Sequence, residues 1–272
     1  MPSMADGPRP ALGKRMRVQL LPSTIDDNGR ASARQHLLTL VIDDRVAIDA
    51  GCLAFSCSAK QREQIRDIVL THTHLDHIAS LPMFVDDLFS TLTEPIRVHA
   101  TQGMIDILER DIFNWDIYPR FSELSNGSGK VVEYHAFGAN DSIKIEHLSI
   151  RSVPVNHKVA ANGFIISDGA SSIAITGDTA ETDEMWRHCT STKDLKAVLV
   201  ECAFPNEMAE LAGASHHLVP RMLATELQKL QSDARVLVIN LKPMYRDRVI
   251  EQIDALGLKN VEILEVGRIY EF

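Results

Sequence analysis

The sequence predicts an α/β fold in which helices cover a sheet core. Short runs rich in β-branched residues alternate along the chain with longer runs that carry apolar residues at helical spacing. With 45% hydrophobic and 24% charged residues, the composition is typical of a globular protein and excludes a disordered or fibrous one. A chain of 272 residues buries a large core, so we expect a single domain over residues 16–272. Residues 1–15, which are rich in Pro, Gly and charge, are expected to form a flexible segment.

Strands dominate the start of this domain. Residues 36–49 hold two β-branched and Leu-rich runs that are interrupted by two adjacent aspartates, a pattern typical of a hairpin. The run 65–71 predicts a further strand. Apolar residues at helical spacing follow, and they predict helices over 78–90 and 101–113.

Strands and helices are mixed in the rest of the chain. A hairpin is expected over 163–177, where the chain turns through Asp168 and Gly169. The remaining strands are expected at 96–100, 131–137, 143–155, 196–203 and 235–240, and the remaining helices at 183–189, 206–212, 218–231 and 246–256. Residues 114–130 fit neither period, and we expect a surface loop there that could lie over a site.

Charge and composition narrow the range of functions. The net charge of −9, without any tract rich in Lys or Arg, disfavours binding to a nucleic-acid polymer. A small anionic substrate remains possible if a metal ion supplies local positive charge. The sequence contains neither a membrane-spanning apolar run nor a signal peptide, and its four cysteines share no CxxC spacing. We therefore expect a cytoplasmic protein with free thiols and no membrane contact.

Four side chains that can bind metal lie within six residues, where the strand at 65–71 ends. They are His72, His74, Asp76 and His77. Imidazole nitrogen and carboxylate oxygen are ligands that borderline divalent ions such as zinc accept. His72 and His74 are two residues apart, as side chains on one face of an extended segment are. A polar turn with solvated histidines is the alternative, but the strand before the motif and the helix after it favour a metal site.

A family resemblance begins with the string THTHLDHIASLP at 71–82, which is similar to the His-x-His-x-Asp-His signature of the metallo-β-lactamase superfamily. Within that superfamily it resembles the class II 3′,5′-cyclic-nucleotide phosphodiesterases. Further matches follow the family's order, at AIDAG (47–51), VNHKVAANGF (155–164), AITGDT (174–179), VECAFPN (200–206) and ASHHLVP (214–220). The resemblance covers roughly residues 36 to 250. It implies a four-layer αββα sandwich with a two-metal site at one sheet edge.

The resemblance also implies two divalent metal ions, zinc in the first place and manganese or iron as alternatives. Their ligands would be His72, His74, His157 and Asp178 for the first ion, and Asp76, His77 and Asp178 for the second. Asp178 could instead cap a helix, but a carboxylate with two oxygens can bridge two cations. Asp49 is expected to orient a ligand through a hydrogen bond, and Glu201 to be a structural carboxylate beside the site.

The family pattern breaks at the end of the last core strand. Family members usually place a histidine there, directly before Leu-Lys-Pro, as the third ligand of the second ion, whereas this chain has Asn240. An amide oxygen is a harder and weaker ligand than imidazole. Three outcomes follow: Asn240 or water completes a weak second site, His216 is recruited, or the protein binds one metal ion only.

By resemblance, the expected function is hydrolysis of a small phosphodiester, most simply a 3′,5′-cyclic nucleotide, by metal-activated hydroxide. His217 matches the family's His-Leu-x-Pro histidine and is the candidate proton donor to the leaving oxygen, although it could merely begin a helix. Asp76 is the candidate for orienting the nucleophile. The alternatives are an RNA-end nuclease, a lactamase, a thioester hydrolase, or a catalytically weakened metal-binding protein. Because family members often pair, a homodimer is also expected.

Overall fold

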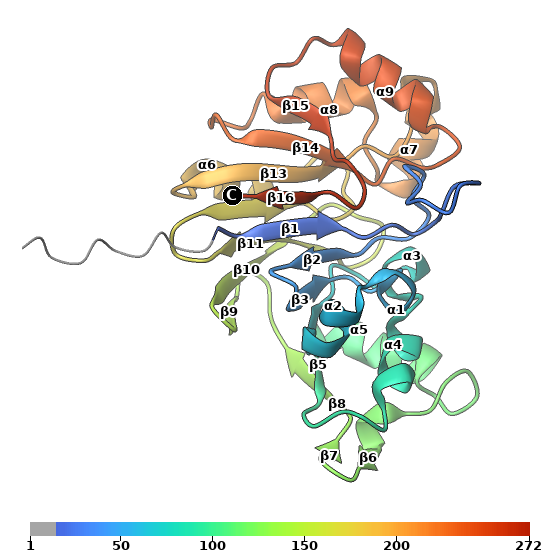
Figure 1. Ribbon diagram of the computed structural model, residues 1–272. Helices are drawn as coiled ribbons and strands as arrows, with labels where there is room; N and C mark the ends of the chain where they lie inside the picture. The colour runs from blue at the N-terminus through green and yellow to red at the C-terminus, as the bar shows by residue number, and fades with distance from the viewer. Residues whose placement is uncertain (1–14) are drawn as a thin grey trace, which may run out of the picture.

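Two seven-stranded sheets form the centre of the molecule (Figure 1). The computed structural model describes residues 15–272, so the predicted flexible segment lies outside the described residues except for its last residue. In spatial order the first sheet consists of β16 (Ile269–Glu271), β1 (Arg17–Leu20), β2 (Leu40–Ile42), β3 (Val46–Ile48), β4 (Asp67–Val69), β5 (Ile96–Ala100) and β8 (Val132–Ala136). Strands β3, β4, β5 and β8 run parallel to one another, and β16, β1, β2 and β3 are antiparallel.

The second sheet comes from the later half of the chain. In spatial order it consists of β15 (Val261–Ile263), β14 (Arg235–Ile239), β13 (Leu195–Glu201), β12 (Ser172–Ile175), β11 (Asn162–Ser167), β10 (Leu148–Pro154) and β9 (Ser142–Ile145). Strands β12 to β15 are parallel, whereas β9 to β12 are antiparallel. Each sheet therefore has a parallel part, and the carboxyl ends of parallel strands are where α/β sheets place their ligands.

Helices lie on the outer side of each sheet (Figure 1). Those from the first half are α1 (Leu53–Ser56), α2 (Ala59–Gln64), α3 (Leu75–Ile78), α4 (Leu81–Leu88), α5 (Gln102–Ile107), a π-helical turn (Leu108–Ile112) and a 3-10 turn (Phe121–Glu123). Those from the second half are α6 (Glu184–Ser191), a 3-10 turn (Asn206–Met208), α7 (Ala209–Ser215), α8 (Pro220–Leu227) and α9 (Arg246–Ala255). None of the helices within 15–272 is both long and apolar enough to cross a membrane.

Three layers of buried apolar side chains separate these four layers of structure. Alternate residues of a strand point to opposite faces, and β12 shows the consequence. Ile173 and Ile175 belong to the cluster between the two sheets, together with Ile48 and Phe164. Ala174, between them in sequence, belongs to the cluster under α6, α8 and α9. A third cluster lies between the first sheet and α1, α4 and α5. The order of layers is therefore the αββα sandwich that the sequence resemblance implied.

Both hairpins predicted from turn chemistry are confirmed. β2 and β3 pair on either side of Asp43 and Asp44, whose φ angles of 53° and 62° suit a two-residue hairpin turn. β11 and β12 pair on either side of the turn that contains Gly169, with φ of 92°. These turns were predictable because the residues that make them are adjacent in the sequence.

Two sequence predictions are wrong. The single strand expected over 143–155 is a hairpin, because Glu146 adopts a φ of 54° and turns β9 back onto β10. The segment 114–130 is not irregular throughout, because β6 (Ser125–Asn126) and β7 (Gly129–Lys130) form a small hairpin. Asn126 donates hydrogen bonds to the carbonyl oxygens of Phe89 and Leu92, at 2.7 and 2.8 Å, and so fixes this hairpin beside the end of α4.

Candidate metal centre

The candidate site residues follow the carboxyl ends of strands in both sheets. The motif at 72–77 follows β4, and Asp178 follows β12. Glu201 is the last residue of β13, and Asn240 comes directly after β14. Because these strands end at the same edge of the sandwich, residues more than 100 positions apart in sequence become neighbours.

The motif loop rests on the Asp-x-Gly segment 49–51, which is part of the family match AIDAG. The backbone N–H of Ala50 donates to the carbonyl oxygen of His77 at 2.7 Å. A Cβ atom on Gly51 would lie 2.0 Å from the carbonyl oxygen of Asp76. Only glycine fits at this position, because any side chain would push the motif loop away from the strand end.

Three histidines converge in the first half of the site. The ligand nitrogens of His72, His74 and His157 all lie within 4.8 Å of one another. Nε2 of His157 is 3.2 Å from Nδ1 of His74. Two nitrogens bound at about 2.0–2.1 Å to one tetrahedral ion are roughly 3.3 Å apart. The spacing of these rings therefore fits a single divalent ion.

Hydrogen bonds decide which nitrogen of each ring faces the centre. Nδ1 of His157 lies 3.1 Å from the carbonyl oxygen of His216, which can only accept, so Nδ1 carries the proton. Nδ1 of His72 lies 3.0 Å from Oγ1 of Thr71, whereas its Nε2 is buried and has no hydrogen-bond partner among the described residues. A buried polar atom left in this way costs about 1–3 kcal/mol, so a ligand for Nε2 is expected.

Burial favours the neutral form of all three histidines. Burial, together with the neighbouring His77, lowers the pKa of His72 to about 2. Burial also lowers the pKa values of His74 and His157. Neutral imidazole has the lone pair that a metal ion needs, so the donor set fits a borderline cation such as zinc.

His77 and Asp178 form the second half of the site. Nε2 of His77 is buried, has no hydrogen bond within the described chain, and lies 3.4 Å from Oδ2 of Asp178. Burial disfavours charge on His77, but Asp178 and Asp49 outweigh it and raise the pKa of His77 well above its usual range. The same contact holds the pKa of Asp178 well below its usual range, against the opposing effect of burial.

Asp49 was expected to orient a ligand through a hydrogen bond, and its partner in the structure is His77. Its Oδ2 lies 2.7 Å from Nδ1 of His77, and its oxygens accept from the backbone N–H and the hydroxyl of Thr71, both at 2.8 Å. A buried carboxylate that receives these bonds fixes the ring so that Nε2 faces Asp178. Asp49 itself adopts a φ of 61°, which turns the chain out of β3 towards the motif loop.

The remaining predicted ligands have protein partners. Oδ1 of Asp178 accepts a hydrogen bond from Nδ2 of Asn240 at 2.6 Å. Oδ2 of Asp76 accepts one from Nζ of Lys242 at 3.0 Å. Nδ1 of His216 lies 2.9 Å from Oδ1 of Asn156, so His216 contributes its backbone carbonyl oxygen to the centre, while its ring pairs outside it.

His217 stands beside a carboxylate whose role the sequence analysis missed. Nδ1 of His217 lies 2.7 Å from Oε1 of Glu201, which is fully buried. Glu201 also accepts from the backbone N–H groups of Thr179, Ala203 and Leu218. Because Nδ1 is held by Glu201, any bond from this ring to a substrate goes through Nε2. The available signal was a glutamate directly after the apolar run 197–200 of a core strand, since buried carboxylates need a partner.

The charges around His217 raise its pKa above that of an ordinary histidine. Burial alone would lower its pKa, but Glu201 and Asp178 together raise it. Ligand atoms of His157, Asp178 and His217 lie within 4.8 Å of one another, so this ring borders the metal-competent histidines. The arrangement can hold a proton next to a cation site, which suits a proton donor in hydrolysis.

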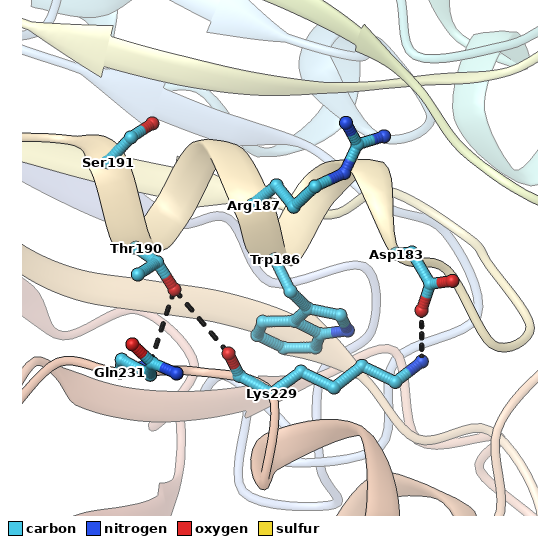
Figure 2. A pocket seen from close by; sticks show the side chains of 7 residues that line it. All are labelled: Asp183, Trp186, Arg187, Thr190, Ser191, Lys229 and Gln231. Carbon is cyan, nitrogen blue, oxygen red and sulfur yellow. Dashed lines mark hydrogen bonds and ion pairs between the residues drawn. The ribbon is translucent and has the colours of Figure 1, made fainter.

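A hollow of about 630 Å³ lies beside α6, away from these residues (Figure 2). Trp186 and Arg187 line it, and Lys229 crosses it. Nζ of Lys229 is 2.7 Å from carboxylate oxygens of both Asp183 and Glu226. Because its charge is already matched by two carboxylates, this lysine offers little attraction to an anionic substrate.

Comparison with known families matches a large part of the chain. The model of the beta-lactamase superfamily domain matches residues 45–239, which include every candidate ligand except Asn240. The matched segment runs from the start of β3 to the end of β14, across both sheets.

Curated relatives share about a quarter of their residues with this chain. A probable 3′,5′-cyclic-nucleotide phosphodiesterase from Yersinia pestis is 27% identical over 190 residues, which are 62% of this chain and 52% of that protein. A 3′,5′-cyclic-nucleotide phosphodiesterase from Schizosaccharomyces pombe is 26% identical over 251 residues, or 77% of this chain and 70% of that protein. The chain therefore spans about half the length of the Yersinia relative and more of the yeast one.

Solved structures share the fold at lower sequence identity. Unliganded yeast PDE1 aligns with a TM-score of 0.76 at 16% identity, over 95% of this chain and 99% of that one. The metallo-beta-lactamase fold protein YhfI from Bacillus subtilis aligns with a TM-score of 0.72 at 16% identity, over 95% and 100% of the two chains. The short form of human tRNase Z aligns with a TM-score of 0.65 at 17% identity, over 93% and 98%. At these identities the likeness establishes the fold.

Proposed function

Because the chain belongs to the beta-lactamase superfamily, we propose that it is a metal-dependent phosphodiesterase that hydrolyses a small phosphodiester, most simply a 3′,5′-cyclic nucleotide. The observation that carries this proposal is the convergence of His72, His74 and His157, three neutral histidines, beside Asp178. The names of the curated relatives support the cyclic-nucleotide substrate.

His72, His74, His157 and the neighbouring Asp178 would hold the first ion, and zinc is the ion that this donor set suits best. When bound, a divalent ion polarises a phosphoryl oxygen and makes water a stronger nucleophile near neutral pH. Asp76, His77 and Asp178 would hold a second ion more weakly, because the chain offers an amide where an imidazole would complete the site. Manganese or iron are the alternatives for either position.

The chain's own residues supply the proton and the orientation. His217 donates a proton or a hydrogen bond from Nε2 to the leaving oxygen, because Glu201 holds Nδ1 and favours the charged ring. The negative carboxylates of Asp178 and Asp76 attract cations to the site, and their oxygens orient the attacking water. Burial of most of these groups keeps bulk water away, which strengthens each electrostatic interaction.

A direct assay tests the proposal. Metal-loaded protein is incubated with cyclic AMP, cyclic GMP and a bis-aryl phosphate, and a His74→Ala variant with unchanged thermal stability is the matched control. We expect hydrolysis of at least one of these diesters by the parent protein and little by the variant. Tight metal binding without any diester hydrolysis, together with cleavage of a lactam, a thioester or an RNA end, would overturn the substrate class and leave the fold assignment intact.

A cytoplasmic location is also part of the proposal. The four cysteines are free, and Cys52, Cys189 and Cys202 are buried. Unpaired cysteines are typical of a reducing compartment. Fractionation of the source cells, with detection of the protein by antibody, measures the location, and recovery from an oxidising compartment would contradict it.

A further inference from the structure

We infer that Lys242 is a built-in cation at the second metal position, so that the protein at rest holds one divalent ion and the ammonium group of Lys242. The inference rests on the proposed metal-dependent function. Its starting point is the contact of 3.0 Å between Nζ of Lys242 and Oδ2 of Asp76, the carboxylate that the family pattern assigns to the second ion.

This ion pair competes with a second metal ion for Asp76. A divalent ion would have to approach a carboxylate oxygen to about 2.0–2.2 Å. It would then lie within a few ångströms of the ammonium group, where Coulomb repulsion between the two cations is strong. The side chains of Lys242 and Asp76 are 29% and 28% exposed, so water screens this repulsion only in part.

The other ligands of the second position make contacts with groups other than Asp76. Oδ1 of Asp178 accepts the hydrogen bond from Asn240, and ligand atoms of His77 group with those of His72 and Asp178. Within residues 15–272, no ligand atom of Asp76 belongs to a group of metal-competent atoms that lie within 4.8 Å of one another. The first position differs, because three histidine nitrogens converge there.

The backbone places Lys242 in this position. Asn240 adopts a φ of 54°, a left-handed conformation that asparagine tolerates better than most residues, and it turns the chain at the end of β14. The backbone N–H of Lys242 then donates to the carbonyl oxygen of Ala203 at 3.2 Å, and Pro243 follows. Lys242 therefore lies two residues beyond this turn, with its backbone held by Ala203 and its Nζ at Asp76.

The consequence is an active site with one metal ion and one fixed ammonium group. An anionic substrate with a phosphoryl group would meet two positive centres, although only one of them is an ion taken from solution. In this chain the amide of Asn240 and the Lys242–Asp76 ion pair then act together at the second metal position. Metal stoichiometry measures this property independently of turnover.

The test is a metal titration of the full-length protein, read by calorimetry and by native mass spectrometry with zinc as the probe. The variants are Lys242→Met, which removes the charge at similar length, and Lys242→Arg, which keeps it. Lys196→Met is the matched control. Lys196 is an exposed lysine near the start of β13, and its Nζ lies 3.7 Å from Oδ1 of Asp194. Lys242→Gln is prepared in parallel in case the methionine variant does not fold.

We expect the parent protein to bind one tight equivalent of zinc. The uncharged variants should bind a second equivalent at least about tenfold more tightly than the parent does, because the competing cation is gone. Lys242→Arg and Lys196→Met should behave like the parent. Two equally tight equivalents in the parent, or an unchanged second affinity in both uncharged variants, would overturn the inference while the proposed function stands. Absence of any tight equivalent in the parent would overturn the proposed function.

Discussion

Replacement of one residue, His217, should separate proton transfer from metal binding. Its Nδ1 is committed to Glu201, so the ring keeps one nitrogen for the substrate. Replacing His217 by Ala should lower kcat by roughly 10²–10⁴-fold if this ring is the proton donor, and should leave the tight metal equivalent in place. Steady-state kinetics and metal analysis of the same preparation measure both effects.

A histidine far from the site serves as the control. His147→Ala removes an exposed ring at the turn between β9 and β10, where it pairs with Asp43, and should leave kcat unchanged. An unchanged kcat in His217→Ala would refute the proton-donor role. Loss of metal from that variant would show that the ring acts as a ligand instead.

Asn240 is the residue at which this chain departs from the family pattern. An Asn240→His variant should tighten the second metal equivalent, since imidazole is a better ligand than an amide for zinc. The gain should be larger when Lys242→Met is combined with it, because the two changes act on the same position. Zinc titration of the single and double variants measures this coupling, and a second equivalent that stays loose in the double variant would contradict it.

Asp67 provides a prediction at the scale of a strand, away from the site. It lies in β4 with a side chain that is 5% exposed, and it accepts two hydrogen bonds from Arg97 and one from His99. Burial alone would raise its pKa, but Arg97 and His99 outweigh burial and lower the pKa to about 2. A carboxylate whose pKa is depressed on folding stabilises the protein above its unfolded pKa, and this contribution is lost as the pH falls through the folded pKa.

Asp67→Asn should therefore lower the free energy of unfolding at pH 7 by about 2 kcal/mol. The difference from the parent should stay constant down to about pH 4, fall to roughly half near pH 3, and disappear below about pH 2. Urea unfolding at these pH values gives the free energies. Glu94→Gln, which removes an exposed partner of Arg97, is the control and should cost less than 1 kcal/mol. If the difference in the free energy of unfolding between the parent and Asp67→Asn does not depend on pH, the depressed pKa of Asp67 is contradicted.

The elements that the sequence predicted well are those whose cause is local. Turns through adjacent aspartates or Asp-Gly, and the metal motif at 72–77, are complete within a few residues. β1 and β16 were missed, because β16 pairs with β1 across most of the chain and neither has an alternation long enough to detect. The hairpin of β9 and β10 was missed because one glutamate in a left-handed conformation interrupts an otherwise continuous pattern.

The candidate site was likewise predictable where its residues are close in sequence and unpredictable where they are distant. The candidate ligands came from short motifs. An orienting role was expected for Asp49, but the structure was needed to show that its partner is His77. The pairs Glu201–His217 and Asp76–Lys242 could not be predicted, because each joins residues that are distant in sequence and lie on different elements. The second pair also joins the loop after β4 of one sheet to the segment after β14 of the other. Sequence spacing indicates which residues can bind a metal, but only the fold shows which of them are already paired.

At the scale of the whole molecule, the two sheets contribute unequal parts of one centre. The first sheet supplies the motif loop and Asp49, whereas the second supplies His157, Asp178 and the Glu201–His217 pair. A protein with net charge −9 would attract the proposed anionic substrate only through positive charge that is concentrated at this junction. Bound metal is therefore the property on which the whole account depends.

The most direct test of metal binding is the metal content of the purified protein and of His74→Ala. It is measured by inductively coupled plasma mass spectrometry after removal of loosely bound ions. His74 faces the centre through a nitrogen 3.2 Å from that of His157, so its loss removes a direct bond to the ion. The account predicts about one equivalent of a divalent transition metal in the parent protein and loss of most of it in the variant. The same metal content in both proteins would contradict it.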